Sequence, residues 1–420
     1  MSGNGEAIIQ RLDPLDWLVE PGLVRVLDAL EAKGGPGCVR LVGGCVRNAL
    51  LKRPIADIDL ATVLLPQETL QALSVAGIRA LPTGLAHGTI TAIVNGTPFE
   101  VTTLRRDVST DGRRAVVGFT KDWSEDAGRR DFTLNAIYAG RDGTLFDPTG
   151  HGIADALAGK ILFVGDARTR IREDYLRVLR FFRFLAWYGR GAPDATALEA
   201  CAHEAAGVAI LPAERTSREL LTLLSARDPR QAIHLMAETG VLGVLLPGAT
   251  GITLFEALCK LEIQDWGAGD ALLRLASLLP LDPDGMAGAL EHLRLSNRDR
   301  DRLLALVQTE VAISAAMDAK AWRRALYRLG KQAFLDRVSL AWARTGDPAW
   351  QAPLDLANHW QAPVFPVAGA DIVRLGVPKG PRVGAILRDL ERIWVEGDFS
   401  DDKPALIARA DLHRAEGSSE

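Results

Sequence analysis

The spacing of apolar residues changes once along this 420-residue chain, near residue 150. Before that point, short runs such as "CVRLVG", "GTITAIV" and "PFEVTTL" are rich in β-branched residues and alternate with brief helical segments. After it, apolar residues recur at spacings of three and four, as in "EDYLRVLRFFRFLAWY", with Pro and Gly between the segments. The first pattern is typical of strands and the second of amphipathic helices. We therefore predict an α+β chain in which a mixed sheet with helices precedes an all-helical remainder.

Length and composition limit the class of protein. The chain exceeds the roughly 250–300 residues at which single cores stop growing, so we expect more than one domain. Its 48% hydrophobic and 24% charged residues are typical of a soluble globular protein. No segment approaches the ~18 apolar residues of a membrane span, and the N-terminal residues lack the pattern of an export signal. The four cysteines form no CxxC pair. We expect a cytoplasmic protein with no membrane partner, no disulfide and no zinc site.

The net charge of −4 conceals an uneven distribution. Residues 160–190 contain eight basic and three acidic side chains, whereas residues 395–420 contain three basic and seven acidic ones. Local excess of positive charge matters more for contact with a polyanion than the average does.

Two glycines, Gly43 and Gly44, stand between the predicted strand "CVRLVG" and the helix that "CVRNALL" predicts. Glycine lets the backbone approach a ligand closely, and amide groups at a helix start point toward an anion. Arg47 lies in the first turn of this helix, where its guanidinium can bind the same anion. We interpret the segment as a phosphate cradle; an ordinary strand-to-helix turn is the alternative.

Two aspartates in "DIDLAT", Asp57 and Asp59, are two residues apart on a predicted strand and so face the same side. Like charges in one volume are costly unless a cation neutralises them, and Mg²⁺ suits oxygen ligands completed by phosphates. Glu100, in the predicted strand "PFEVTTLR", offers a third carboxylate if its apolar neighbours face the core. A solvated strand face is the alternative for Glu100. We predict a magnesium site at Asp57 and Asp59.

Five segments, in one order and with comparable spacing, resemble the bacterial class II tRNA nucleotidyltransferases and their relatives the bacterial poly(A) polymerases, within the polymerase-β-like superfamily. They are "GGCVR", "DID", "FEVTTLR", "RRDFTLNAIY" and "REDYLRVLRFFRF". The resemblance implies a nucleotidyltransferase head over residues 1–155, a helical neck with a nucleotide-selecting helix over 156–225, and a helical, tRNA-binding body and tail over 226–420.

The resemblance also implies roles for individual residues. Asp57 and Asp59 would hold two magnesium ions, one polarising the 3′-hydroxyl of the RNA primer and both stabilising the displacement of pyrophosphate. The glycine turn and Arg47 would receive the triphosphate of CTP or ATP. By resemblance only, ribose and phosphates would bind Arg130, Asp131 and Asn135. A capped helix start is a compatible alternative for these three residues.

The segment "REDYLRVLR" resembles the family's amino-acid template. Asp174, Arg177 and Arg180 recur every three residues, which predicts one shared helix face. Cytosine and adenine both present an amine beside a ring-nitrogen acceptor, whereas uracil and guanine present a carbonyl beside an N–H. An Asp that accepts and an Arg that donates therefore admit C and A, because the wrong base leaves buried polar groups unpaired. A surface ion pair on an arginine-rich helix is the alternative. Further arginines are expected to contact RNA phosphates: Arg168, Arg170, Arg172, Arg183 and Arg190.

Other segments bear on the reaction. Residues 107–127 resemble the family's flexible loop, associated with the switch from C to A addition, which favours a complete CCA-adding enzyme. Asn48 and Tyr175 stand where the family usually has Asp and Pro. The seven histidines are scattered without ligand spacing, so no phosphohydrolase domain is predicted.

We therefore expect a transferase that adds CCA to the 3′ end of tRNA from CTP and ATP, with Mg²⁺ as cofactor. A poly(A) polymerase would share every head motif, but the acidic C-terminal stretch counts against it, and an enzyme that adds only CC is a further alternative. An RNA-binding relic without activity predicts a broken carboxylate set, and a dinucleotide-binding oxidoreductase predicts a GxGxxG that is absent. The sequence carries no indication of an oligomeric state.

Overall fold

The chain folds into two compact units, Met1–Pro247 and Gly248–Glu420. The computed structural model describes residues 8–13, 16–111, 114–266, 269–308 and 310–416. The predicted domain limits at residues 155 and 225 both lie inside the first unit, and the division into head, neck and body stays a prediction.

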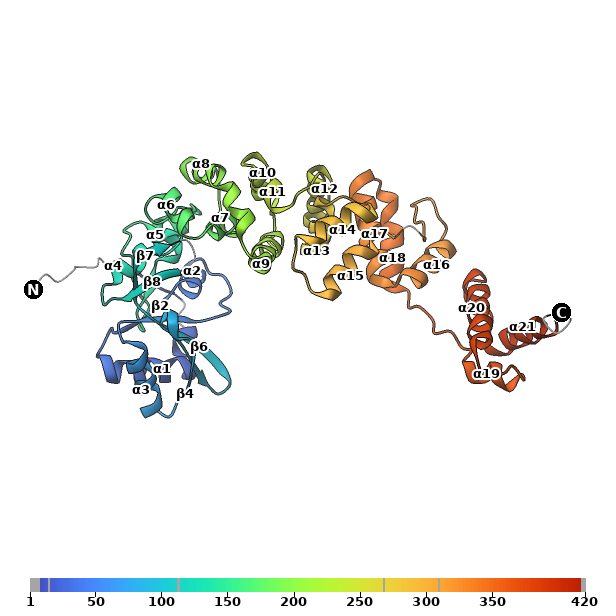
Figure 1. Cartoon of the computed structure of the whole chain (residues 1–420), viewed down its shortest axis with the longest axis horizontal. Coiled ribbons are helices and arrows are strands. Elements are labelled where there is room, and N and C mark those ends of the chain that lie inside the picture. The colour runs from blue at the N-terminus through green and yellow to red at the C-terminus, as the bar shows by residue number, and fades with distance from the viewer. Residues whose placement is uncertain (1–7, 14–15, 112–113, 267–268, 309, 417–420) are drawn as a thin grey trace, which may run out of the picture. The chain divides into compact units, whose positions relative to one another are not determined.

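An eight-stranded mixed sheet forms the N-terminal part of the first unit, with strand order β1-β10-β9-β2-β3-β6-β5-β4 (Figure 1). Its strands are β1 (Ile8–Arg11), β2 (Val39–Val42), β3 (Asp59–Thr62), β4 (Arg79–Gly84), β5 (Thr89–Val94), β6 (Thr97–Thr103), β9 (Tyr138–Ala139) and β10 (Thr144–Phe146). Neighbouring strands in this sheet pair antiparallel, except that β3 and β6 run parallel. The apolar runs of the sequence thus form the sheet that was predicted.

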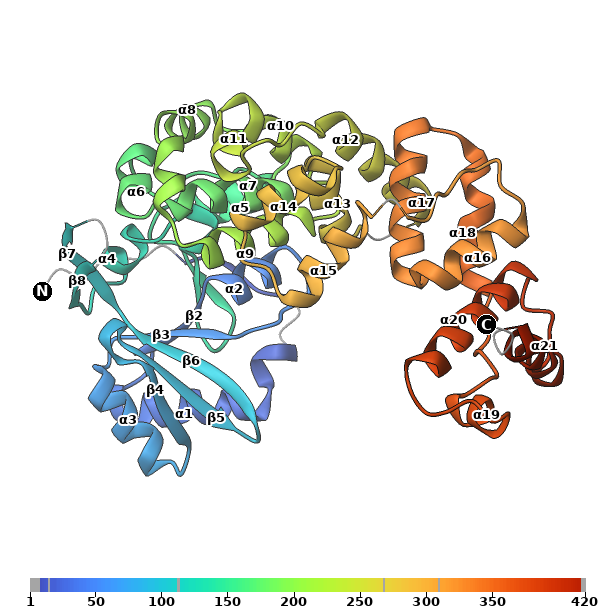
Figure 2. The ribbon, with the colours of Figure 1, turned by 45° about the vertical axis from the view of Figure 1, so that its right-hand side comes forward.

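Short helices accompany the sheet. Helices α1 (Pro21–Gly34) and α3 (Pro66–Val75) pack against each other and against β6 (Figure 2). Helix α2 (Gly44–Leu50) follows β2 directly and contacts η3 (Thr133–Asn135) and α5 (Gly152–Ala158). Two further 3₁₀ turns are η1 (Asp16–Val19) and η2 (Leu85–His87).

The segment 107–127, predicted to resemble a flexible loop, falls largely within a hairpin and a helix. Strands β7 (Arg105–Asp111) and β8 (Arg114–Phe119) pair in a two-stranded sheet of their own, and α4 (Trp123–Gly128) follows. Residues 112 and 113, between the two strands, lie outside the described residues. Movement of this segment stays a prediction.

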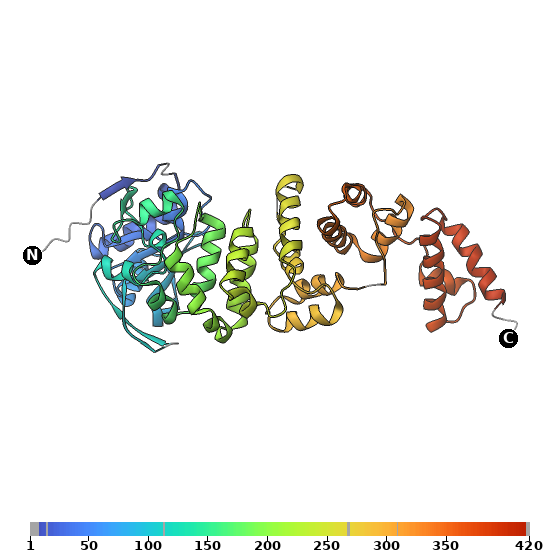
Figure 3. The same ribbon diagram turned by 90° about the horizontal axis from the view of Figure 1, so that it is seen from above.

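Helices complete the first unit after the sheet. They are α6 (Ala167–Glu173), α7 (Leu176–Tyr188), α8 (Ala195–His203), η4 (Ala205–Ile210), α9 (Ala213–Leu224), α10 (Arg230–Glu238) and α11 (Val241–Leu245). Helix α7 packs against α6, α9 and α10, and its buried face is rich in Leu and Phe. Figure 3 shows these helices in green, one beside another. The three-and-four spacing of the sequence therefore produced one central apolar helix with arginines on its remaining face.

All regular elements among the described residues of the second unit are helices. Its elements are α12 (Ile252–Leu261), η5 (Glu262–Trp266), α13 (Ala271–Leu278), α14 (Pro283–Glu291), α15 (Asn297–Ala305), α16 (Ala319–Leu329), α17 (Lys331–Thr345), η6 (Pro348–Trp350), α18 (Gln351–His359), α19 (Gly369–Arg374), α20 (Pro381–Glu396) and α21 (Lys403–Glu416). One core surrounds Phe334 and Trp342, and a second surrounds Leu390 and Trp394. None of the described helices has the length and apolarity to cross a bilayer.

Candidate active site

Two of the predicted carboxylates lie side by side on parallel strands. Asp59 begins β3 and is paired in register with Glu100 of β6, and Asp57 precedes β3 by two residues. Paired residues on adjacent strands face the same side of a sheet. Burial raises the pKa of Asp59 above its ordinary value, and the negative charges of Glu100 and Asp57 raise it further. The structure therefore brings both Asp57 and Glu100 within electrostatic reach of Asp59.

These carboxylates do not form a metal cage by themselves. The described residues contain no group of three or more His, Cys, Asp or Glu side chains placed to hold one metal ion. Mg²⁺, however, usually takes one or two protein carboxylates and completes its shell with water and substrate phosphates. A cation beside Asp57 and Asp59 would offset the repulsion that raises the pKa of Asp59. The donor set thus fits a divalent cation that arrives with a phosphorylated substrate.

At the glycine turn, the backbone of Gly43 and Gly44 lies close to two arginine side chains. Gly43 has a φ of 72°, in the left-handed region that favours glycine, and Gly44 begins α2. A Cβ placed on Gly43 would lie 3.9 Å from Nη1 of Arg130, and one on Gly44 would lie 3.8 Å from Nη2 of Arg47. Two guanidiniums therefore border the turn, as a phosphate cradle requires.

Arg47 is buried among neutral partners. It donates from Nη1 to Oδ1 of Asn135 (2.5 Å), from Nη2 to Oη of Tyr188 (2.8 Å) and from Nε and Nη2 to Oδ1 of Asn48 (3.2 and 3.0 Å). Burial lowers the pKa of Arg47. Since none of these bonded groups is a carboxylate, the positive charge of Arg47 is left for an anion from outside.

Asn48 connects this arginine to the segment that leads to Asp57. Its Oδ1 accepts from Oη of Tyr188 (3.2 Å) as well as from Arg47, and its Nδ2 donates to the carbonyl oxygen of Pro54 (2.8 Å). A carboxylate at position 48 could not make the bond to Pro54, because it has no N–H to donate. Both polar atoms of the Asn48 amide are therefore engaged, the oxygen as an acceptor and the nitrogen as a donor.

Arg130 is held by a buried carboxylate. It donates from Nη2 and Nε to Oδ2 of Asp126 (2.9 and 3.2 Å), which also accepts from Oη of Tyr138 (2.7 Å). Burial acts to raise the pKa of Asp126, but the charges of Arg130 and Arg129 hold it well below its usual range. The charge of Arg130 also acts to lower the pKa of Asp59. Arg130 thus connects a buried anchor to the carboxylate site.

A continuous chain of hydrogen bonds joins the glycine helix to the helical part of this unit. Nδ2 of Asn135 donates to Oδ1 of Asp131 (3.0 Å), and Nε of Arg180 donates to Oδ2 of the same carboxylate (2.7 Å). Burial opposes ionisation of Asp131, but Arg180 and these hydrogen bonds lower its pKa. We call Tyr188–Arg47–Asn135–Asp131–Arg180 the polar chain. Three of the residues assigned to nucleotide binding by resemblance are thereby brought together with Arg47.

The structure corrects the shared helix face predicted for Asp174, Arg177 and Arg180. Asp174 is not helical: α6 ends before it, and its Oδ1 accepts from the backbone N–H of Leu176 (3.1 Å). Three-residue spacing gives a common face only within one helix, and the helix is interrupted here. Oδ2 of Asp174 accepts from Nη2 of Arg215 (2.8 Å), whereas Arg177 is paired with Glu173.

Asp174 nevertheless stays within electrostatic reach of Arg180. Although burial acts to lower it, the pKa of Arg180 is raised by Asp131 first and, to a smaller extent, by Glu219 and Asp174.

Tyr175 stands where the family usually has Pro. Its ring lies against Gly207 of η4, where a Cβ on the glycine would come within 2.0 Å of Cδ1 of the tyrosine.

Known proteins are similar to this chain over most of its length. The family model of the poly A polymerase head domain matches residues 39–162, and that of the probable RNA and SrmB-binding site of polymerase A matches residues 193–252. The mitochondrial CCA tRNA nucleotidyltransferase 1 of Mus musculus is 36% identical over 381 residues, which cover 88% of this chain and 86% of that protein. The chain belongs to the CCA-adding tRNA nucleotidyltransferases.

Bacterial members and solved structures agree with this assignment. The CCA-adding enzyme of Limosilactobacillus fermentum is 33% identical over 386 residues, covering 88% of this chain and 91% of that enzyme. The crystal structure of the Bacillus stearothermophilus CCA-adding enzyme in complex with CTP has a TM-score of 0.74 and 28% identity, covering 96% of this chain and all of that one. The Thermotoga maritima CCA-adding enzyme, complexed with tRNA, shares the fold with a TM-score of 0.67 at 19% identity. The predicted family and the predicted α+β fold class are confirmed.

In this nucleotidyltransferase, sequence reasoning missed the partners that hold the site residues. Arg130 is bound by Asp126 and Tyr138. Arg47 is bound by Tyr188, and Asp174 by Arg215. Asp126 lies on α4 and Arg130 follows the end of that helix, four residues later. This i,i+4 spacing is the one sequence signal that could have revealed their ion pair. Of the five arginines expected to contact RNA, four are paired with carboxylates: Arg168 and Arg172 with Glu204, Arg170 with Glu173, and Arg183 with Glu219.

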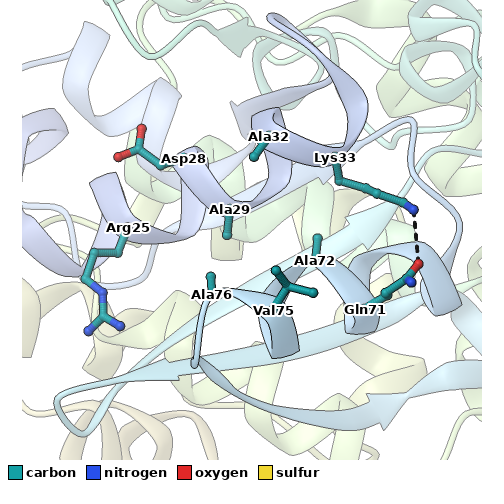
Figure 4. A pocket seen from close by; sticks show the side chains of 9 residues that line it. All are labelled: Arg25, Asp28, Ala29, Ala32, Lys33, Gln71, Ala72, Val75 and Ala76. Atoms are coloured by element: carbon teal, nitrogen blue, oxygen red, sulfur yellow. Dashed lines mark hydrogen bonds between the residues drawn. The ribbon is translucent and has the colours of Figure 1, made fainter.

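A separate cavity of about 510 Å³ lies between α1 and α3 of the nucleotidyltransferase (Figure 4). Small side chains such as Ala29 and Ala72 line it, and Nζ of Lys33 donates to Oε1 of Gln71 (3.0 Å) at its border. None of the predicted site residues is part of its lining.

Proposed function

We propose that this chain adds C, C and A in turn to the 3′ end of tRNA, taking them from CTP and ATP and releasing pyrophosphate. The observation that supports this best is the pairing of Asp59 with Glu100 in a unit whose glycine turn is bordered by Arg47 and Arg130. A carboxylate group for metal and an arginine-lined turn for phosphates are the parts that nucleotidyl transfer needs. Membership of the CCA-adding family supports the RNA substrate and the two nucleotides.

In the proposed reaction, the 3′-oxygen of the primer forms a bond to the α-phosphorus of the nucleotide, and the bond to pyrophosphate breaks. Asp57 and Asp59 would hold Mg²⁺, which supplies polarisation of the primer hydroxyl and neutralises phosphate charge when bound. Arg47 and Arg130 bind the triphosphate and so stabilise the charge that collects on the leaving pyrophosphate. Asn135 and Asp131 orient Arg47 and Arg180 through the polar chain.

Base selection in this proposal falls to Asp174 and Arg177. Both side chains are engaged in the structure, Asp174 with Arg215 and Arg177 with Glu173. A base with an amine beside a ring nitrogen can share or replace these partners, whereas uracil and guanine would leave the carboxylate and the guanidinium facing like groups. Discrimination therefore arises from side chains, without a nucleic-acid template.

Poly(A) synthesis and CC-only addition remain the alternatives to be tested. Purified protein is incubated with magnesium and a tRNA that lacks its last three nucleotides, with CTP, ATP or both, and the products are resolved to one nucleotide. Addition of CCA followed by a stop is the expected result. A long A tail would assign the protein to the poly(A) polymerases, a stop at CC to the partial enzymes, and no extension would contradict transferase activity. Asp59→Ala serves as the inactive control.

We also infer a reducing compartment, with the cytoplasm as the predicted location. The inference rests on four cysteines without CxxC spacing, each of which is buried. Fractionation of cells that express the untagged protein tests it.

A further inference from the structure

The side chain of Arg47 has little donor capacity left for a phosphate. A guanidinium carries five N–H groups. Arg47 makes four hydrogen bonds to neutral side chains, so that within the described residues one N–H, on Nη1, is left over. Arg130, the second arginine at the glycine turn, is paired with Asp126. A triphosphate, with its several negative charges, therefore needs a further donor near this turn.

Arg53 contacts the same aromatic ring as Arg47. The Cζ atoms of Arg47 and Arg53 lie 4.3 and 4.6 Å from the centre of the Tyr188 ring. In the described part of the chain, the side chain of Arg53 has neither an ion pair nor a hydrogen bond. A guanidinium that lies over an aromatic face keeps the N–H donors at its edge free. Arg53 therefore offers the donors that Arg47 lacks.

The end of helix α2 fixes the backbone of Arg53. Its N–H donates to the carbonyl oxygen of Asn48 (2.8 Å), and the N–H of Lys52 donates to that of Ala49 (3.1 Å). These two bonds form a Schellman motif, whose next-to-last residue is left-handed. Lys52 has a φ of 53°, which is unfavourable for a residue with a Cβ. The helix that carries Arg47 thus ends in a defined turn that leads directly into Arg53.

Tyr188, the last residue of α7, is held in place by its neighbours. Its hydroxyl accepts from Nη2 of Arg47 (2.8 Å) and donates to Oδ1 of Asn48 (3.2 Å). Its ring stacks on Phe184, with 5.6 Å between the ring centres. A ring fixed in this way gives the guanidinium of Arg53 a fixed surface.

We propose that Arg53 binds the triphosphate of the incoming nucleotide together with Arg47, and that Tyr188 positions both guanidiniums. The inference rests on the proposed function. The planar fork of Arg53 matches two phosphate oxygens, and bonds between ionised groups are the strong ones. Tyr188 acts through the two arginines and does not itself contact the nucleotide, so it is a positioning residue.

Removal of Arg53 tests the first part. Binding of CTP with Mg²⁺ but without tRNA, and binding of tRNA lacking CCA without nucleotide, are measured for wild type, Arg53→Ala and Arg53→Lys. Arg53→Ala is expected to weaken CTP binding about ten- to thirtyfold and to leave tRNA affinity unchanged. Arg53→Lys should keep part of the CTP affinity, because lysine retains the charge but not the fork. Arg79→Ala, which removes an exposed arginine of β4, is the matched control and should change neither affinity.

A double-mutant cycle tests the role of Tyr188. Tyr188→Phe keeps the ring, so Arg53→Ala should weaken CTP binding by the same factor in this variant as in wild type. Tyr188→Leu removes the ring, and Arg53→Ala should then cost less than about threefold. A merely structural role of Tyr188 predicts the same cost in all three backgrounds, and that result would overturn the second part of the proposal.

The remaining outcomes are equally definite. Unchanged CTP affinity in Arg53→Ala would overturn the first part. Weakened tRNA binding with unchanged CTP binding would also overturn it and assign Arg53 to the RNA. If the wild-type protein fails to extend tRNA but its CTP affinity still depends on Arg53, the proposed function fails and the triphosphate contact stands.

Discussion

Asp59 and Glu100 occupy paired positions on two parallel neighbouring strands, so each carboxylate lies in the field of the other. This pairing, together with burial and the charge of Asp57, raises the pKa of Asp59. A carboxyl group whose pKa is higher in the folded than in the unfolded chain favours folding when it is protonated. Its contribution to stability is therefore lost as the pH rises through that raised pKa.

Asp59→Asn is expected to raise the melting temperature of the metal-free protein at neutral pH, because it removes an ionised group from a repulsive site. The same change should lower nucleotide addition by at least about a thousandfold, since a proposed metal ligand is lost. Mg²⁺ with CTP should stabilise the wild-type protein but not the variant. Thermal unfolding with and without metal checks this, and Asp13→Asn, at an exposed position, is the control. A lower melting temperature for the metal-free variant would contradict the argument.

Asp126→Asn is expected to destabilise the first unit by about 2–3 kcal/mol, because a buried carboxylate that accepts from Arg129, Arg130 and Tyr138 loses its charge. The pKa of Asp126 is depressed, so its contribution is present at neutral pH and is lost as the pH falls toward that depressed pKa. The difference between wild type and variant should therefore shrink in strong acid. Urea unfolding at neutral and acid pH measures it, and an equal difference at both would count against this account.

Asn48→Asp is expected to raise the KM for CTP and ATP about tenfold, or roughly 1.4 kcal/mol. The new carboxylate gives Arg47 an internal counter-ion and cannot donate to the carbonyl of Pro54. Steady-state kinetics on tRNA lacking CCA tests it, with Asn358→Asp, an exposed position on α18, as the matched control. An unchanged KM for both nucleotides would show that the amide is dispensable.

Arg177→Ala is expected to reduce discrimination against UTP by about ten- to a hundredfold, because the donor that matches cytosine and adenine is removed. Addition of CTP and of UTP to the same primer is compared for the variant and for wild type. Since Glu173 also loses its partner, Glu173→Gln is measured in parallel to separate misfolding from misreading. Retention of full discrimination by Arg177→Ala would refute its role in base selection.

Local pattern was sufficient to predict the architecture. The β-branched residues of "GTITAIV" and the three-and-four spacing in "EDYLRVLRFFRFLAWY" predict strand and helix because each pattern is contained within one short segment. The same rule placed Asp57 and Asp59 on one strand face, but β3 begins at Asp59 and Asp57 precedes it, so the magnesium site stays a prediction. The pairing of Glu100 with Asp59 has no local signal, because β6 pairs with β3 only after α3 and the β4–β5 hairpin have intervened.

The partners of the charged residues could not be predicted in the same way. Tyr188 meets Arg47 from 141 positions away, and Arg180 meets Asp131 across 49 positions, so neither contact leaves a local signal. The error at Asp174 has a different origin. Three-residue spacing predicts a shared face only if the helix is continuous, and the extended backbone at Asp174, whose side chain accepts from the N–H of Leu176, interrupts it.

That interruption has a consequence for how one pocket can accept a small pyrimidine and then a larger purine. Arg177 belongs to a regular helix and cannot be relocated without unwinding it, whereas Asp174 has an extended backbone and lies between α6 and α7, outside both helices. We expect the change of size to be absorbed on the carboxylate side. Arg177 would then keep its position for both bases, and Asp174 would adjust its position to the size of the base.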